Sequence, residues 1–423
     1  MCLAGFCLLA SLAQAGGPVF TVTNGDAGPF SGKDHRPLQA AIDQARKQGG
    51  GEIAIGRGEY LIGQSLKISN AGHLSFRGEE GAVLRLPPLP HAKVAEAAES
   101  GATSVRVDRT VRFEPGMVLH FVAPGKVHPF TGKPEPYVLA TIERIEPGVF
   151  VLQRPLEFPL PAGTTVYREG APNVFAISGG CEDITIERLT LDGGRGRNDP
   201  AISGHVIGCG ILAEGRYKYE EGPLGPPVRG LAIRDCVIRG CYGRGVALYS
   251  VVDSTIERCT IEDTVDEAID FDHFAVRCRA VDNRIVRCQV GVEMNDANDC
   301  LVENNRFDSC RAGINLWRWC RQPELNVRNR IVENRFSDTA GSVVLLRAGT
   351  ASNVIEGNII SGCLGNGIVV EGTNQTVVNN QIRGARKEAL VVKGDGHVVR
   401  GNQIEPAEQN LKADIPQKGT KTF

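Results

Sequence analysis

The sequence predicts an all-β solenoid, in which short parallel strands stack along one axis. Two observations lead to this fold class. The first is an apolar position that recurs every 22 to 24 residues, with steps of 30 and 35 where loops intervene. The second is a position nine or ten residues earlier, occupied by Asn in most copies, that recurs with the same period. A repeat with a period in the twenties indicates stacked units that bury one continuous core.

The apolar series predicts strands whose side chains point into the solenoid, and the second series predicts a bend. The apolar series comprises Ile211, Val246, Ile269, Val292, Ile314, Val344, Ile368 and Leu390. The second series comprises Leu189, Cys236, Cys259, Asn283, Asn305, Asn334, Asn358, Asn380 and Asn402. Asn tolerates unusual backbone angles at a bend, and stacked amides can bond from coil to coil. We therefore expect an asparagine ladder inside the solenoid.

The N-terminal part, residues 19–98, is expected to form a cap and the first coils. Before it, residues 1–15 hold an apolar run that ends in Ala13-Gln-Ala15, which is typical of a signal peptide. We therefore expect a secreted or periplasmic protein. Within the cap, Pro37–Gln48 carries apolar residues at helical spacing and ends at a glycine run. A strand and the turn Gly58–Tyr60 follow.

The remaining chain divides by pattern. Residues 99–170 have alternating strands and hairpin turns without the repeat, which predicts an inserted small antiparallel β-domain. Residues 171–405 carry the repeat and are expected to form the parallel β-helix itself. Residues 406–423, which contain Pro, Lys and Gln, are expected to be a C-terminal tail.

The composition argues against a nucleic-acid partner and a membrane span. Lys+Arg 47 against Asp+Glu 49 gives a formal net charge of −2, whereas a nucleic-acid partner would call for a basic excess. The apolar leader is too short to span a bilayer, and we expect a monomer. Of the 13 cysteines, eleven lie between Cys181 and Cys363, on the repeat. Most are expected to be buried thiols, while a Cys236–Cys259 bridge stays open as an alternative.

The cap and the repeat together resemble the right-handed parallel β-helix proteins of the pectate-lyase-like superfamily. The loop Asn24-Gly-Asp26, the helix Pro37–Gln48 and the turn Gly58-Glu-Tyr60 are similar to the N-terminal cap of that superfamily. The resemblance implies a right-handed, single-stranded β-helix with an N-terminal helical cap. It does not imply one activity, because the superfamily contains lyases, hydrolases, epimerases and proteins with no known activity.

Three copies of one short pattern lie between Asp266 and Trp319: Ala268–Asp272, Gly291–Asn295 and Gly313–Trp317. In each copy the second and fourth residues are apolar and point inward, so the third and fifth point outward. Carboxyl groups on adjacent strands raise one another's pKa, which prepares a general acid. The predicted catalytic residues are Asp270, Asp272, Glu293 and His273.

The same face and its loops supply the predicted substrate-binding residues. Long loops at 193–203, 215–227 and 318–330 are expected to wall a groove, as binding of a polysaccharide requires. Trp317 can stack on a sugar ring. The predicted substrate-binding residues are Asn295, Asn315, Trp317, Arg318, Arg347, Tyr249, Glu214 and His205.

Three functions stay open at this point, and the first is favoured. It is glycoside hydrolysis, which needs two carboxyls and no cofactor. Asp270 and Asp272, about 6.8 Å apart along one strand, suit an inverting enzyme. Asp270 and Glu293, about 4.8 Å apart on adjacent strands, suit a retaining one. The segment Asp266–Asp270 resembles part of a polygalacturonase motif, although the other motifs of that family have no counterpart.

The second function is elimination or epimerisation on a uronate polymer, with Arg or His and Ca²⁺. Phe271-Asp-His273 resembles part of a Phe-Asp-Pro-His motif of mannuronan epimerases, without the proline. The Ca²⁺ ligands expected in that case are Asp270, Asp272, Glu293 and Asp296, because carboxylate oxygens suit a hard cation. The third function is a non-catalytic β-helix that binds carbohydrate or has a structural role.

Overall fold

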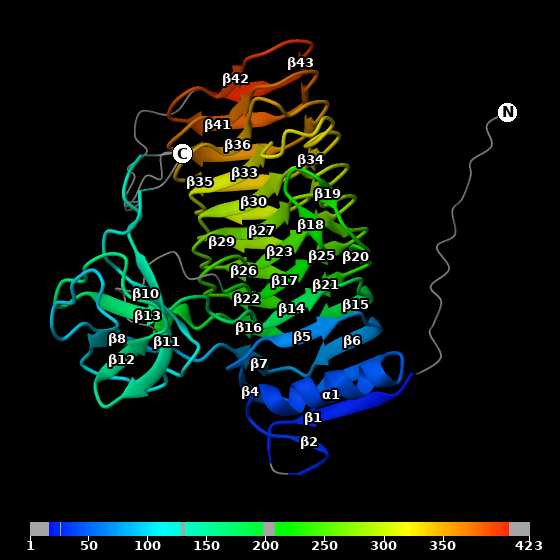
Figure 1. The fold of residues 1–423 in the computed structure, drawn as a ribbon. Coiled ribbons are helices and arrows are strands. Elements are labelled where there is room, and N and C mark those ends of the chain that lie inside the picture. Colours follow the sequence, from blue (N-terminus) through cyan, green and yellow to red (C-terminus); the bar gives the residue numbers. More distant parts are fainter. Residues whose placement is uncertain (1–16, 26, 128–131, 198–207, 406–423) are drawn as a thin grey trace.

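The protein is a right-handed parallel β-helix with a capped N-terminal end and a small domain at its side (Figure 1). Three parallel sheets run along the β-helix and, over the described residues, enclose one continuous apolar core. The predicted leader and tail lie outside the described residues, and no described helix is long and apolar enough to cross a membrane. The computed structural model describes residues 17–25, 27–127, 132–197 and 208–405.

The first two parallel sheets have fifteen and eleven described strands. The fifteen-stranded sheet comprises β1 (Val19–Thr23), β2 (Phe30–Ser31), β3 (Gly51–Ile55), β6 (Gly72–Gly78), β15 (Glu182–Glu187), β20 (Val228–Arg229), β21 (Ala232–Arg234), β24 (Val251–Val252), β25 (Thr255–Glu257), β28 (Arg279–Val281), β31 (Leu301–Glu303), β34 (Arg330–Val332), β37 (Val354–Glu356), β40 (Thr376–Val378) and β43 (Val398–Arg400). The eleven-stranded sheet comprises β4 (Gly58–Leu61), β7 (Ala82–Arg85), β16 (Thr190–Asp192), β22 (Val237–Arg239), β26 (Thr260–Glu262), β29 (Arg284–Val286), β32 (Arg306–Asp308), β35 (Arg335–Thr339), β38 (Ile359–Cys363), β41 (Gln381–Ala385) and β44 (Gln403–Glu405).

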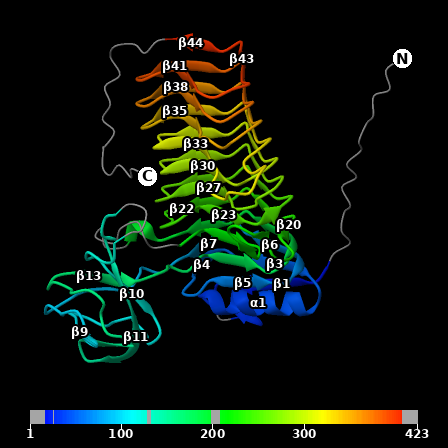
Figure 2. The same ribbon diagram turned by 45° about the horizontal axis from the view of Figure 1, so that its top comes forward.

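The third sheet, which we call the site sheet, has ten described strands. It comprises β5 (Leu66–Ser69), β14 (Phe175–Ser178), β17 (Ile211–Glu214), β23 (Val246–Tyr249), β27 (Glu267–Asp272), β30 (Val290–Asn295), β33 (Ala312–Trp317), β36 (Val344–Leu346), β39 (Ile368–Val370) and β42 (Leu390–Val392). Val246, Ile269, Val292 and Ile314 pair across successive strands and are fully buried. This register confirms the apolar series. Figure 2 shows the stacked coils from a second angle.

Helix α1 (His35–Lys47) covers the N-terminal end of the solenoid (Figure 1). Asp34 caps it, since its side chain accepts a hydrogen bond from the backbone N–H of Arg36. The apolar side chains of α1 are buried against the first coils, among them Leu38 and Ile42. The helical cap is therefore confirmed, and it starts two residues before the predicted Pro37.

The inserted antiparallel β-domain is also confirmed. Its six-stranded sheet has a core of its own, and a tilted edge-to-face pair of rings from Phe113 and Phe150 lies in it, with centroids 4.8 Å apart. The domain projects from the side of the β-helix near the N-terminal end (Figure 1). Its strands are β8 (His91–Lys93), β9 (Ser104–Arg106), β10 (Val118–Phe121), β11 (Val138–Glu146), β12 (Val149–Leu152) and β13 (Thr165–Arg168).

The asparagine ladder is confirmed, with one correction to its physical role. From Asn283 to Asn402, each side-chain Nδ2 donates to the Oδ1 of the next member at 2.9–3.0 Å. The left-handed backbone angle falls on the preceding residue, as at Asp282 (φ 57°) and Asn304 (φ 53°). The ladder residues therefore satisfy buried polar groups, while their neighbours make the bend.

A second amide ladder runs through Asn329, Asn353 and Gln375, and the sequence reasoning missed it. Asn329 Nδ2 donates to Asn353 Oδ1, and Asn353 Nδ2 donates to Gln375 Oε1, both at 3.1 Å. The three positions are 24 and 22 residues apart. They follow the period of the repeat, so this ladder could have been predicted from the sequence.

The eleven cysteines of the described residues, from Cys181 to Cys363, are free and buried. Cys236 and Cys259 are neighbours on the same ladder position, but they do not form a disulfide. Most of the eleven belong to the single core of the β-helix. They act as small apolar residues in that core, as predicted.

Candidate active site

The outward residues of the site sheet form columns, as the register predicted. Asp270 pairs with Glu293, and Glu293 pairs with Asn315, along one column. In the next column Tyr249 pairs with Asp272, and Asn295 pairs with Trp317. Gly291 and Gly313 are the second residues of β30 and β33, where the corner of the coil leaves no room for a side chain. A Cβ at Gly291 would lie 2.4 Å from the Phe307 ring, and one at Gly313 would lie 2.5 Å from a backbone oxygen.

Most of these outward side chains are covered, which the sequence did not predict. Asp270 has 0% of its surface exposed and Asp272 has 5%, while Glu293 and Trp317 are half-buried. The hairpin formed by β18 (Tyr217–Lys218) and β19 (Gly222–Pro223) contributes to the cover. Tyr219 in this hairpin lies edge-on to His273, with ring centroids 4.9 Å apart.

Arg244 is the site residue that sequence reasoning missed. It lies in the turn before β23, and its Nε–H donates to Asp270 Oδ2 at 2.7 Å. The same Nε lies 2.8 Å from Glu267 Oε2, and a terminal nitrogen lies 3.7 Å from Asp266. Arg244 and Glu267 each stand two residues before a member of the apolar series. Both residues could therefore have been identified by extending each predicted strand two residues toward its N-terminus.

Burial and mutual repulsion control the ionisation of this carboxyl cluster, which we define as Glu267, Asp270, Asp272 and Glu293. Burial raises the pKa of Asp270 well above its usual value, and the neighbouring carboxyls raise it further, against the effect of Arg244. Burial likewise raises the pKa of Glu267, Asp272 and Glu293. Burial lowers the pKa of Arg244, but Asp270 and Glu267 outweigh this and raise it. The cluster therefore retains a proton at a pH where isolated carboxyls are ionised.

Glu293 is the member of the cluster that remains partly exposed and is held in a fixed position. Asn295 Nδ2 donates to its Oε1 at 3.0 Å, and Asn315 Nδ2 donates to its Oε2 at 3.4 Å. Asn295 is in turn held by Trp319 Nε1, which donates to Asn295 Oδ1 at 3.2 Å. Two of the predicted substrate-binding residues, Asn295 and Asn315, therefore position Glu293.

Aromatic and imidazole side chains border Asp272. The backbone N–H of His273 donates to Asp272 Oδ1 at 2.7 Å, and the Tyr249 side chain also bonds to this carboxylate. Burial raises the pKa of Tyr249, and it raises the pKa of Tyr217 to about 12. The rings of Tyr217 and Tyr249 are stacked with centroids 6.2 Å apart. Both phenols are therefore neutral near pH 7.

Asp296 lies next to the carboxyl cluster, because His273 Nδ1 is 3.2 Å from Asp272 Oδ1 and 3.0 Å from Asp296 Oδ2. Its other partners are structural. Its Oδ1 accepts hydrogen bonds from the backbone N–H groups of Trp319 and Cys320, at 2.8 and 3.1 Å. Its Oδ2 lies 3.0 Å from His273 Nδ1. The guanidinium of Arg244 already occupies one side of Asp270. The four acids expected to bind Ca²⁺ therefore do not form one ligand set among the described residues.

The other predicted binding residues fall into two groups. Arg347 lies over the Trp317 ring at 4.2 Å, and the Trp317 and Trp319 rings are stacked with centroids 6.0 Å apart. These side chains border the carboxyl cluster at its C-terminal end. Arg318 instead donates to the backbone oxygens of Cys320 and Arg321. It therefore holds its own loop in place.

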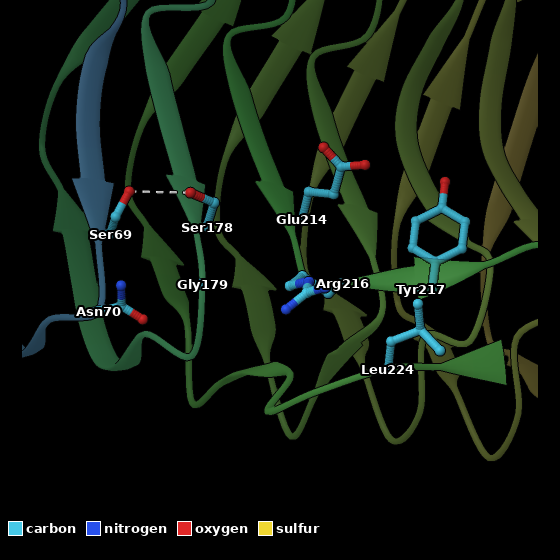
Figure 3. A pocket seen from close by; sticks show the side chains of 9 residues that line it. Ser69, Asn70, Ser178, Gly179, Glu214, Arg216, Tyr217 and Leu224 are labelled. Atoms are coloured by element: carbon cyan, nitrogen blue, oxygen red, sulfur yellow. Dashed lines mark hydrogen bonds between the residues drawn. The ribbon is translucent and has the colours of Figure 1, made fainter.

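On the N-terminal side of the cluster, Glu214 lines a groove of about 530 Å³ (Figure 3). The groove follows the ends of β5, β14 and β17, where Ser69, Ser178 and Glu214 continue the column of Tyr249 and Asp272. His205, the last predicted binding residue, lies outside the described residues. The groove is lined by Ser69, Asn70, Ser178, Gly179, Glu214, Gly215, Arg216, Tyr217 and Leu224.

Comparisons with known proteins agree with the fold. Two segments, residues 226–329 and 325–404, match the family model described as right handed beta helix region. No curated protein matches the chain. The A-module of mannuronan C-5 epimerase AlgE4 from Azotobacter vinelandii is similar in structure, with a TM-score of 0.60 and 14% identity, over 90% of this chain and 87% of that chain.

Two further solved structures are similar. DFA-IIIase from Arthrobacter chlorophenolicus A6 has a TM-score of 0.51 and 12% identity, over 92% of this chain and 84% of that chain. The A-module of mannuronan C-5 epimerase AlgE6 from Azotobacter vinelandii has a TM-score of 0.50 and 11% identity, over 88% of this chain and 96% of that chain. At these identities the likeness shows the fold alone.

Proposed function

Since the chain is a right-handed parallel β-helix protein of the pectin lyase fold, we propose that it hydrolyses a polysaccharide with the carboxyl cluster of the site sheet. One observation carries the proposal. Glu293 is partly exposed, has a raised pKa and is fixed by two amide donors. A protonated carboxyl that meets solvent next to further carboxyls is what a glycosidase needs as its general acid.

The proposed mechanism gives the two carboxyls of one column different roles. Glu293 donates its proton to the oxygen of the glycosidic bond, so the leaving sugar departs as an alcohol. Asp270 is the nucleophile, and its Oδ1 has no hydrogen-bond partner among the described residues. As the glycosidic bond breaks, Asp270 forms an ester bond to the anomeric carbon. Water then hydrolyses this ester and gives a proton back to Glu293. The two residues pair on adjacent strands, about 4.8 Å apart, which is the spacing that suits retention. Because Asp270 is covered, the side chains above it must move before a substrate reaches it.

The charge of the site favours a substrate with few carboxylates. Asp266 and the four acids of the carboxyl cluster lie near each other, and Arg244 is bound among them. A polyuronate would add negative charge to this acidic face, which like-charge repulsion opposes. A neutral polysaccharide meets no such cost.

The shape of the site supports a polymer that runs along the helix axis. The 530 Å³ groove lies on one side of the cluster, and the Trp317 ring lies on the other, along the same column of the site sheet. The exposed Trp319 ring, which is stacked on Trp317, offers a face for a sugar ring, and Glu214 offers hydrogen-bond acceptors in the groove. A polymeric substrate also agrees with the secreted or periplasmic location that we propose from the leader.

A second candidate is epimerisation or elimination on a uronate polymer. Tyr249, Asp272 and His273 lie together, and proton transfer next to a sugar carboxylate needs such groups. A mannuronan C-5 epimerase module is also similar in fold, with a TM-score of 0.60. Arg347, which lies against Trp317, is the cation best placed to neutralise a substrate carboxylate.

A panel of neutral and uronate polysaccharides distinguishes these functions. New reducing ends without absorbance at 235 nm mean hydrolysis, and absorbance at 235 nm means elimination. A change in the uronate epimer ratio, read by NMR without cleavage, means epimerisation. The proposal expects reducing ends from a neutral polymer. Binding without any of these products would favour the non-catalytic function instead.

A further inference from the structure

Three metal-binding side chains meet under the β18–β19 hairpin, outside the carboxyl cluster. A ring nitrogen of His273, a carboxylate oxygen of Asp296 and the thiol of Cys320 all lie within 4.8 Å of one another. His273 follows β27, Asp296 follows β30, and Cys320 lies in the loop after β33. Asp296 and Cys320 are buried, and His273 is half-buried. Three successive coils of the helix thus contribute one side chain each.

The thiol of Cys320 has surroundings unlike those of the core cysteines. Its Sγ lies 2.7 Å from the backbone oxygen of Tyr219 in the hairpin. The other thiols with a carbonyl acceptor lie at 3.1 Å, as in Cys181, to 3.9 Å, as in Cys310. Cys320 also packs outside the main core, beside Phe274 and Leu325. The Tyr219 backbone oxygen, a possible fourth donor atom, therefore lies beside the thiol.

We propose that His273, Asp296 and Cys320 bind one Zn²⁺ ion, with the backbone oxygen of Tyr219 as the fourth ligand. Imidazole, thiolate and carboxylate are the side-chain ligands that zinc takes, in a tetrahedral arrangement of four. On binding, the S–H bond of Cys320 breaks, its proton passes to solvent, and a zinc–sulfur bond forms. The thiolate and the carboxylate then balance the two charges of the ion.

The ligand types select zinc over harder cations. Ca²⁺ and Mg²⁺ take oxygen ligands, whereas a thiolate and an imidazole suit Zn²⁺. The surrounding contacts also hold a ligand in place, because the backbone N–H groups of Trp319 and Cys320 donate to Asp296. Such supporting bonds orient ligands and raise the affinity of a metal site.

The site would hold the cover of the carboxyl cluster in place. Tyr219 belongs to the hairpin after β17, and Cys320 belongs to the loop after β33, which are 101 residues apart in the sequence. Gln322 Nε2 and the backbone N–H of Arg321 already bond to Glu220 across the same contact. Zinc would add a bond that links both segments to the strand ends of β27 and β30. This inference holds whether or not the carboxyl cluster is catalytic.

Zinc itself is the probe for the test. The full chain is dialysed, incubated with Zn²⁺, freed of excess metal and assayed for bound zinc by mass spectrometry and for its unfolding temperature. The test variant is Cys320→Ser, and the matched control is Cys363→Ser, a buried cysteine far from the hairpin. We expect one zinc ion per chain and a raised unfolding temperature in the parent and the control, and the loss of both effects in Cys320→Ser.

Cobalt gives a second measurement that does not depend on the variants. Co²⁺ bound to the thiolate of Cys320 would give sulfur-to-metal charge-transfer absorbance in the parent protein. Zinc content with that absorbance supports the proposal, even if Cys320→Ser fails to fold. A parent protein that takes up neither metal, or a folded Cys320→Ser variant that binds as much zinc as the parent, would overturn it.

Discussion

Arg244 Nε lies 2.7 Å from Asp270 Oδ2, so the guanidinium of Arg244 forms an ion pair with a buried carboxylate of the carboxyl cluster. The stability of the fold therefore depends on this ion pair. A buried acid whose partner is removed must remain as an uncompensated charge or take up a proton. Arg244 is thus a structural requirement for the acids that we propose as catalytic.

Replacing Arg244 with methionine should therefore destabilise the fold strongly. We expect a loss of about 3–5 kcal/mol near neutral pH, the usual cost of breaking a buried ion pair. The loss should shrink at lower pH, because the acids then take up protons. Urea unfolding measures it. The control is Arg258→Met, in an exposed pair with Asp235, where the loss should be much smaller because water screens the pair. Similar losses in the two variants would contradict the account.

Glu267→Gln should change how stability depends on pH. The folded protein raises the pKa of Glu267 above its unfolded value. The folded state therefore binds this proton more tightly than the unfolded state does. The stability that this proton gives is fully present below the unfolded pKa and is lost as the pH rises through the folded pKa. Glutamine has no proton to lose, so its stability relative to the parent should increase from about pH 4 upward. Urea unfolding at several pH values gives this difference, and a constant difference would refute the predicted shift.

The asparagine ladder should be most sensitive in its middle. Asn334 is fully buried, donates to Asn358 Oδ1 and accepts from Asn305. Asn334→Ala leaves several buried groups without partners, so we expect a loss on the order of 3 kcal/mol. Asn402 lies at the end of the ladder and is half-buried. Asn402→Ala should cost clearly less in thermal or urea unfolding, and an equal cost would argue against a cooperative ladder.

Calcium should have little effect on the protein. The Arg244 guanidinium lies against Asp270, and Asp296 lies with the imidazole of His273 and the thiol of Cys320. The described residues therefore do not gather the oxygen ligands that Ca²⁺ takes. Adding Ca²⁺ to dialysed protein should therefore change neither its unfolding temperature nor its activity. Mg²⁺ at the same concentration controls for ionic strength. A rise in unfolding temperature with Ca²⁺ alone would mean that the acids rearrange into a ligand set.

The fold could be predicted from the sequence because the repeat shows which residues of successive strands lie side by side. Side chains alternate along a strand, and the period of the repeat aligns the strands. Positions such as Ile269 and Val292 therefore reveal which residues face inward. The pairing of Asp270 with Glu293 follows directly, and the structure contains it.

The burial of the site could not be predicted in the same way. Whether an outward residue meets solvent depends on segments that do not repeat, such as the hairpin with Tyr219 and the loop with Trp319. Their paths are set by contacts between distant parts of the chain, such as Cys320 with Tyr219. Asp296 illustrates the difference. It was expected to share a Ca²⁺ site with Asp270, Asp272 and Glu293, but it lies beside His273 and Cys320 and accepts backbone hydrogen bonds from that loop.

Activity of Glu293→Gln on a polysaccharide that the parent protein cleaves tests the central claim most directly. The matched control is Glu303→Gln, which changes a half-buried glutamate of the next coil segment on another sheet. We expect the release of reducing ends to fall by about 10²- to 10⁴-fold in Glu293→Gln, the usual contribution of a general acid. The control should retain parental activity. Full activity in Glu293→Gln would contradict the proposed site.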